Sequence, residues 1–140
     1  MDEKILSFLK PDGFVRRYVG ARFVKELIKL GAQFEYFGEF KPKPEFIANE
    51  HYKEHKGKPF YNWLVSFITS APIVVMILRG DGIAKKVRDL LGATMCEKAD
   101  PSSIRGKYGL GAGVNVAHAS EDSNAGLRET ELWENILRDR

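Results

Sequence analysis

Four segments of the chain have the hydrophobic pattern of β-strands. Residues 5–9 are apolar except for one serine and end at the turn-type sequence KPDG of residues 10–13. Residues 73–78 form a continuous apolar run rich in β-branched side chains, which is typical of a strand buried on both faces. Residues 34–40 alternate less regularly, and residues 114–119 form a short last segment. The pattern therefore predicts four strands.

Apolar side chains recur with the spacing of amphipathic helices in five other segments. Two of these segments end at a glycine, Gly31 or Gly92, which commonly stops a helix. Two others are separated by Gly57 and Pro59, which predicts a helical hairpin. The predicted helices cover residues 19–30, 44–55, 60–69, 82–91 and 122–137.

The order of these elements indicates the fold class. It runs strand, helix, strand, helical hairpin, strand, helix, loop, strand, helix. Four strands with two main crossover helices favour an α+β fold, a ferredoxin-like four-stranded antiparallel sheet packed with helices. A length of 140 residues suits a single domain over residues 1–140.

Composition and charge narrow the classes of function. Hydrophobic residues make up 44% of the chain and charged residues 29%, which is ordinary for a globular protein. The formal net charge of +3 is too small to indicate a nucleic-acid surface, but it suits an anionic small ligand.

The sequence also predicts a cytoplasmic location. Cys96 is the only cysteine, which excludes an intrachain disulfide and fits a reducing compartment. The apolar segment near the N-terminus is broken too early for a signal peptide. Residues 73–78 form the longest apolar run elsewhere, and they are far fewer than the roughly 20 residues that span a bilayer.

His118 is the strongest candidate for chemistry. It lies among small and apolar residues after the glycine-rich residues 109–113, and a serine and two acidic residues follow it. An imidazole is a usable nucleophile at neutral pH, because its free pKa lies near 6.5. With one nitrogen hydrogen-bonded and the other facing a pocket, it can accept a phosphoryl group and pass it on.

Several residues could bind phosphate. Lys10 follows a predicted strand, and Arg88, Thr94 and Arg105 lie on or after the predicted helix 82–91. Guanidinium groups bind phosphate oxygens bidentately and stay charged, and a lysine supplies a point charge. Together these side chains would suit a polyphosphate.

Other chemistries lack their motifs. The glycine-rich segment has neither the Lys-Ser/Thr end of a P-loop nor the setting of a dinucleotide fingerprint. No Gly-x-Ser-x-Gly elbow of a hydrolase is present. His51, His55 and His118 lack partners at a recognisable metal-ligand spacing, so no protein metal site is expected.

Taken together, these motifs resemble the nucleoside diphosphate kinase family along nearly the whole chain. The residues that carry the resemblance are residues 10–13 (KPDG), His51 with Tyr52 and His55, residues 58–60 (KPF), Pro72, Arg88, Gly92, Thr94, residues 104–106 (IRG), Asn115, residues 118–120 (HAS), Glu129 and Trp133.

The resemblance implies a role for each matching position. His118 would accept the γ-phosphoryl group of a nucleoside triphosphate, mainly ATP, and pass it to a nucleoside diphosphate by a ping-pong mechanism. Glu129 would hydrogen-bond the other ring nitrogen with support from Ser120, and Lys10 and Tyr52 would reach the transferred group. The other positions would bind the nucleotide: Arg88, Thr94 and Arg105 at the phosphates with His55 as a lesser contact, Phe60 at the base, and Asn115 with Lys10 at the ribose.

The resemblance also implies a cofactor and an assembly. Mg²⁺ would bind mainly through the nucleotide phosphates, with few or no protein ligands. The family is usually hexameric, so a homohexamer is expected, with a homotetramer as the alternative. Met95-Cys96 replaces the usual Asn-Pro of a subunit-contact loop, and Glu121 replaces the usual aspartate after the serine. Neither change removes a residue of the transfer site.

Two further hypotheses remain open on the sequence. A ferredoxin-like sheet with 11% aromatic residues could bind single-stranded nucleic acid, although the RNA-recognition signature is missing. Nucleic acid is therefore not expected as the main partner. A catalytically inactive relative is the other hypothesis, and the presence of His118 and Lys10 argues against it.

Overall fold

A computed structural model describes residues 2–111 and 113–139, so Met1, Ala112 in the glycine-rich segment and Arg140 lie outside the description. Its four strands form one sheet in the order β2-β3-β1-β4, and each neighbouring pair is antiparallel. This arrangement confirms the ferredoxin-like prediction. The strands are β1 (Asp2–Leu9), β2 (Gln33–Phe40), β3 (Ile73–Asp81) and β4 (Ala117–Ala119).

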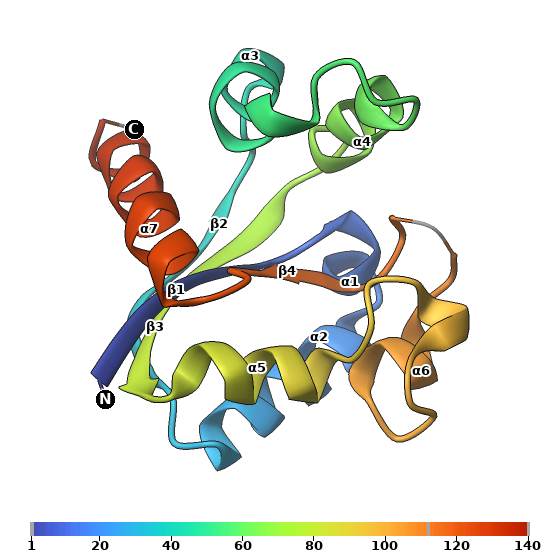
Figure 1. Ribbon diagram of the computed structural model, residues 1–140, viewed down its shortest axis with the longest axis vertical. Helices are drawn as coiled ribbons and strands as arrows, with labels where there is room; N and C mark the ends of the chain where they lie inside the picture. Colours follow the sequence, from blue (N-terminus) through green and yellow to red (C-terminus); the bar gives the residue numbers. More distant parts are fainter. Residues whose placement is uncertain (1, 112, 140) are drawn as a thin grey trace.

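Helices cover both faces of the sheet (Figure 1). α2, α5 and α6 lie below it in this view, and α3, α4 and α7 lie above it. The α-helices are α1 (Pro11–Val15), α2 (Arg17–Lys29), α3 (Pro44–Phe46), α4 (Tyr61–Ile68), α5 (Ile83–Leu91), α6 (Ile104–Tyr108) and α7 (Ser123–Arg138). Shorter turns are η1 (Ile47–His51), η2 (Lys53–His55) and η3 (Cys96–Lys98). None of the described helices is both long and apolar enough to span a membrane.

The central strand β3 divides the core into two halves. Met76 and Leu78 pack into one cluster with side chains of α2 and α5. Val75 and Ile77 point the other way and pack with Trp133 of α7. A strand that is buried on both faces needs no polar alternation, so the structure confirms the prediction made from residues 73–78.

Residues 44–55 do not form the single helix that the sequence predicts. α3 ends after one turn, and η1 then continues with a wider turn in which the Tyr52 N–H donates to the Ile47 carbonyl at 2.8 Å. The Tyr61 hydroxyl donates to the Ala48 carbonyl at 2.7 Å and ties this segment to α4. A wide turn changes the angular spacing of the side chains, so the helical period of residues 44–55 is not kept. The contact with α4 holds the segment in this form.

Two local predictions in the loops are also wrong. The KPDG sequence of residues 10–13 begins α1, because Pro11 takes the first helical position, where its missing N–H costs nothing. Residues 104–108 form α6 in a region predicted as loop. Ser103 caps this helix by accepting from the Gly106 N–H at 3.1 Å, a start signal that the glycine inside the helix obscured.

The predicted strand 114–119 is shorter in the structure because of Val116. Its φ of 76° lies in the left-handed region, which a β-branched residue rarely adopts. The Val116 N–H donates to the Asp12 carboxylate at 2.9 Å, and its carbonyl accepts from the Lys10 N–H at 2.9 Å. These bonds hold the turn, so β4 starts only at Ala117.

Gly126 lets α7 pack against β1. A side-chain carbon at this position would collide with the Lys4 carbonyl oxygen and press on Ile5. Alanine in place of glycine usually favours a helix by up to about 1 kcal/mol. Here the backbone of β1 leaves no room, so the close approach requires glycine.

We therefore expect Gly126→Ala to lower the free energy of unfolding by about 1–3 kcal/mol, because overpacking outweighs the gain in helix propensity. Urea unfolding followed by circular dichroism measures this change. Leu127→Ala is the matched control, because Leu127 is the next residue of α7 and is 62% exposed. An unchanged or higher stability for Gly126→Ala would contradict the packing argument.

Candidate active site

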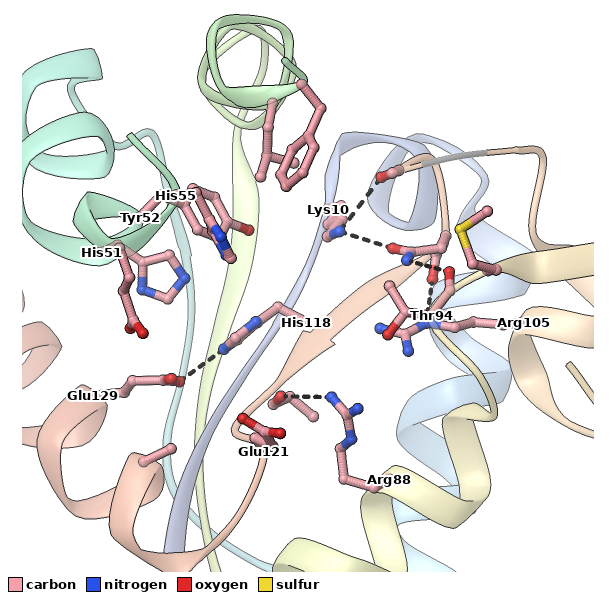
Figure 2. A pocket seen from close by; sticks show the side chains of 18 of the residues that line it. Lys10, His51, Tyr52, His55, Arg88, Thr94, Arg105, His118, Glu121 and Glu129 are labelled. Carbon is pink, nitrogen blue, oxygen red and sulfur yellow. Dashed lines mark hydrogen bonds and ion pairs between the residues drawn. The ribbon is translucent and has the colours of Figure 1, made fainter. Parts of the chain in front are cut away.

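One cavity of about 760 Å³ gathers nearly all the residues that the sequence singled out. It lies between the segment from η1 to α4 and the ends of β1 and β4 (Figure 2). Ser120 is not part of the lining, but its hydroxyl donates to Glu129, which is. The predicted residues on the lining are Lys10, Tyr52, His55, Phe60, Arg88, Thr94, Arg105, Asn115, His118 and Glu129.

A carboxylate fixes the orientation of His118. Oε1 of Glu129 lies 2.8 Å from Nε2 of His118 and 2.9 Å from the Ser120 hydroxyl. Burial alone would raise the pKa of the Glu129 carboxyl, but the charge and hydrogen bond of His118 outweigh it and lower this pKa to about 2. An ionised carboxylate can only accept hydrogen bonds. Nε2 therefore donates its proton to Glu129, and Nδ1 has a free lone pair whenever the ring carries only that one proton.

The sheet and a second histidine confine the His118 ring. His118 is paired with Phe8 in the sheet, and the two rings are stacked with centroids 4.9 Å apart. The His51 ring meets His118 edge-on, also at 4.9 Å. These contacts limit rotation of the imidazole, as a positioned nucleophile requires.

His51 is a buried neighbour to which the sequence analysis assigned no role. Its Nδ1 accepts from the Trp133 indole N–H at 3.0 Å, so Nε2 must carry the ring proton. Among the described residues, this Nε2 has no hydrogen-bond partner. Burial lowers the pKa of His51 well below its ordinary value, and the nearby charge of His118 adds to the effect. His51 is therefore an uncharged side chain that packs beside His118. The spacing of His51, Tyr52 and His55 in the sequence did not indicate this role.

Lys10 is an almost fully buried cation. Its Nζ donates to Oδ1 of Asn115 at 2.8 Å and lies 3.4 Å from the Gly113 carbonyl. Burial and the positive charge of Arg105 lower the pKa of the Lys10 ammonium to about 7. A buried ammonium without a carboxylate bonded to it favours a ligand that brings negative charge.

Arg105 supports the backbone around the site. Its guanidinium donates to the carbonyls of Gly92 at 3.1 Å, Asn115 at 3.1 Å and Ala117 at 2.6 Å. Burial, followed by the charge of Arg88, lowers the pKa of Arg105 to about 10, so it stays protonated at neutral pH. Because a guanidinium has five N–H donors, two remain for a ligand.

Arg88 and Thr94 have fewer contacts with the rest of the chain. Arg88 makes one long bond, 3.4 Å, to the Ala119 carbonyl. Thr94 is exposed, and its carbonyl accepts from Nδ2 of Asn115 at 3.0 Å. Both amide atoms of Asn115 are thus bonded within the protein, while the Thr94 hydroxyl and part of the Arg88 guanidinium remain available to a ligand.

Three aromatic side chains form the opposite wall. Burial raises the pKa of Tyr52, so its hydroxyl is protonated and can donate. His55 lies 3.1 Å from Nζ of Lys58, and burial together with the Lys58 charge lowers its pKa. Phe60 is 47% exposed and packs its ring 5.5 Å from His55. This wall is mainly apolar, whereas Lys10 and Arg105 lie on the other side of the pocket (Figure 2).

Among the described residues, the side chains that line the cavity do not form a metal site by themselves. Within residues 2–111 and 113–139, no group of three or more His, Cys, Asp or Glu side chains could hold a metal ion. Glu54, Glu121 and Glu129 are the carboxylates of the cavity lining, and Glu129 is already bonded to His118 and Ser120. An ion in this pocket would need oxygen ligands from a bound molecule.

Comparison with known proteins decides the family. A family model described as nucleoside diphosphate kinase matches residues 3–135. The chain belongs to the nucleoside diphosphate kinase family. A nucleoside diphosphate kinase of Staphylococcus epidermidis is 39% identical over 134 residues, which cover 94% of this chain and 87% of that protein.

Solved structures of the family share the fold of this member. The nucleoside diphosphate kinase of Aquifex aeolicus matches with a TM-score of 0.87 at 32% identity and covers 95% of each chain. The kinase of Halobacterium salinarum, solved in complex with CDP, also has a TM-score of 0.87, at 40% identity over 95% of this chain and 88% of that chain.

The bonds of Arg105 predict a structural cost for replacing it. Lysine cannot reach three separate carbonyls, so Arg105→Lys leaves at least two of them unpaired and lowers the free energy of unfolding by about 2–5 kcal/mol. Arg88→Lys is the matched control and should change it by less than about 1 kcal/mol, because Arg88 makes one long bond. Equal losses in urea unfolding would show that the carbonyl contacts do not distinguish the two arginines.

Proposed function

We propose that this chain transfers the γ-phosphate of a nucleoside triphosphate, mainly ATP, to a nucleoside diphosphate through a phosphohistidine on His118. The observation that carries the proposal is the pairing of Nε2 with the ionised Glu129, which leaves the lone pair of Nδ1 free. A neutral imidazole held in this way is a nucleophile. Membership of the nucleoside diphosphate kinase family supports the choice of substrates.

In the first half-reaction, Nδ1 of His118 attacks the γ-phosphorus while the bond from that phosphorus to the β–γ bridging oxygen breaks. The nucleoside diphosphate leaves with the bonding electrons. Glu129 stabilises the positive charge that develops on the ring, and the Ser120 hydroxyl bonds the same carboxylate oxygen. Because the site holds the reacting groups in a fixed orientation, the transfer step avoids the entropy cost of bringing them together. This saving is a major part of such catalysis.

The second half-reaction reverses these steps with a different diphosphate. An oxygen of its terminal phosphate attacks the phosphorus, and Nδ1 leaves with its electron pair. The first diphosphate must depart before the second can occupy the cavity, so ping-pong kinetics follow. Lys10, Arg88 and Arg105 would neutralise the moving charge, with Tyr52 as a hydroxyl donor.

The nucleotide would enter with its phosphates toward His118. Thr94 and His55 would add contacts to the phosphates, Phe60 would stack on the base, and Asn115 with Lys10 would reach the ribose. Mg²⁺ would bind through phosphate oxygens and neutralise part of their charge. The small number of free carboxylates on the lining supports this mode of binding.

Self-association as a homohexamer in the cytoplasm completes the proposal, with a homotetramer as the alternative. Strand β2 lies at the edge of the sheet, and Phe37 on it is 56% exposed, which supports contact with another copy. Light scattering of the purified protein tests the assembly. The hypothesis of single-stranded nucleic-acid binding on the sheet loses its main support, because helices cover both sheet faces.

The phosphohistidine is tested by incubation with γ-labelled ATP and magnesium. The protein should acquire an acid-labile label that is lost on addition of GDP. His118→Gln should fold but lose the label, and phosphotransfer should fall at least about 10³-fold, as it does when a nucleophile is removed. His55→Gln keeps His118 and should retain the label. Labelling of folded His118→Gln would show that another residue is the nucleophile.

Lys10 should take up a proton when a nucleotide binds. Its pKa of about 7 in the free protein leaves it mostly neutral at pH 8, and bound phosphate raises this pKa because it stabilises the ammonium. Binding therefore takes up as much as about one proton at pH 8 and weakens as the pH rises above 7. Calorimetry of ADP binding in buffers of different ionisation enthalpy measures the uptake.

Lys10→Met is the matched control for this experiment. It lacks the titrating group, so its binding enthalpy should not depend on the buffer. The same buffer dependence in both proteins would assign the proton to a different group.

A further inference from the structure

Trp63 is an exposed aromatic residue of the cavity to which the proposed function gives no role. It lies on the first turn of α4, three residues after Phe60, and both residues are 47% exposed. Residues three apart on a helix share a face, and both line the cavity. The other tryptophan, Trp133, is fully buried.

Neighbouring groups hold the indole in place. Trp63 stacks on Phe67 with ring centroids 5.2 Å apart and an angle of 14° between the planes. Its ring also lies against Gly113, where a side-chain carbon would come within 2.5 Å of the indole. The Gly113 carbonyl is in turn 3.4 Å from Nζ of Lys10. Trp63 thus joins α4 to the segment that bounds the phosphate side of the cavity.

The cavity is polar at one end and apolar at the other. Lys10, Arg88 and Arg105 bring positive charge to one side of the cavity (Figure 2), whereas Phe60, Trp63 and Leu64 contribute apolar surface from the start of α4. A nucleotide has the same division between its phosphates and its base. Aromatic surfaces bind bases through stacking, which tolerates every base because each has a π-face.

We propose that Trp63 is a second aromatic contact for the nucleotide base, beside Phe60, and that it favours purines over pyrimidines. This inference rests on the proposed function, since it takes the ligand to be a nucleotide. Because Phe67 and Gly113 already hold the Trp63 indole, ligand binding does not cost this side chain rotamer freedom. Its contact therefore adds more affinity than the contact of a mobile side chain would. A purine offers the larger ring area, and it therefore gains more from this contact.

Binding is tested apart from catalysis in the His118→Asn protein, which cannot form the phosphohistidine. ADP, CDP and inorganic tripolyphosphate are titrated by calorimetry and by tryptophan fluorescence. ADP should quench the emission of Trp63, whereas tripolyphosphate, which has no base, should not. Adding Trp63→Phe should remove the quenching specific to ADP.

Affinity gives the second measurement in the same background. Trp63→Ala should weaken ADP binding roughly tenfold, as loss of one stacking contact does. CDP binding should weaken less, and tripolyphosphate binding should not change. Trp63→Phe should keep most of the affinity for ADP. Ile28→Ala is the matched surface control, because Ile28 is 61% exposed on α2 and is not part of the cavity lining.

Each outcome distinguishes the inference from the proposed function. Unchanged ADP binding in Trp63→Ala overturns the base contact, and so do equal losses for ADP and tripolyphosphate, which would show that Trp63 only supports the Gly113 segment. A wild-type protein that acquires no label from ATP, while ADP still depends on Trp63, overturns the proposed transfer and leaves the base contact intact.

Discussion

The hydrogen bond between Glu129 and Nε2 of His118 is the interaction on which the site depends. It decides which ring nitrogen carries the proton and which one faces the cavity. Glu129 lies on α7, and α7 reaches this position because Gly126 lets it approach β1 closely. The Ser120 hydroxyl connects the same carboxylate to β1, since its oxygen also accepts from the Leu6 N–H at 3.0 Å. The tautomer of one imidazole thus follows from the packing of a helix on a strand.

The buried positive charge on one side of the cavity destabilises the protein when no ligand is bound. Burial lowers the pKa of both Lys10 and Arg105, and a nearby positive charge lowers it further: that of Arg105 for Lys10 and that of Arg88 for Arg105. Val116, two residues before His118, holds an unfavourable backbone conformation that is fixed by the Asp12 carboxylate and the Lys10 N–H. Strain and unpaired charge of this kind persist where the surrounding structure outweighs them. An anionic ligand relieves the charge, so the same groups that destabilise the free chain favour phosphate binding.

The apolar side of the cavity differs in its charge and in the exposure of its aromatic side chains. His51 stays neutral because it is buried and bonded to Trp133, and it therefore adds no charge beside His118. Phe60 and Trp63 remain half exposed at a cost in hydrophobic burial. The free cavity thus has charge on one side and apolar surface on the other. This division orients any ligand that has both a charged and an apolar part.

The sequence by itself determined the elements whose pattern is local and strong. The β-branched run of residues 73–78, the spacing of apolar residues on α5 and α7, and the order of strands and helices predicted the ferredoxin-like sheet, because burial imposes its period on the chain. The motifs around His118, Lys10 and Arg105 indicated the family, since each has a distinctive order of residue types. Only the tertiary structure decided the form of residues 44–55, the helix at 104–108, the left-handed Val116, the neutral state of His51 and the carbonyl bonds of Arg105. These features depend on groups far apart in the chain, such as Trp133 with His51 or Asp12 with Val116, and no local pattern encodes such contacts.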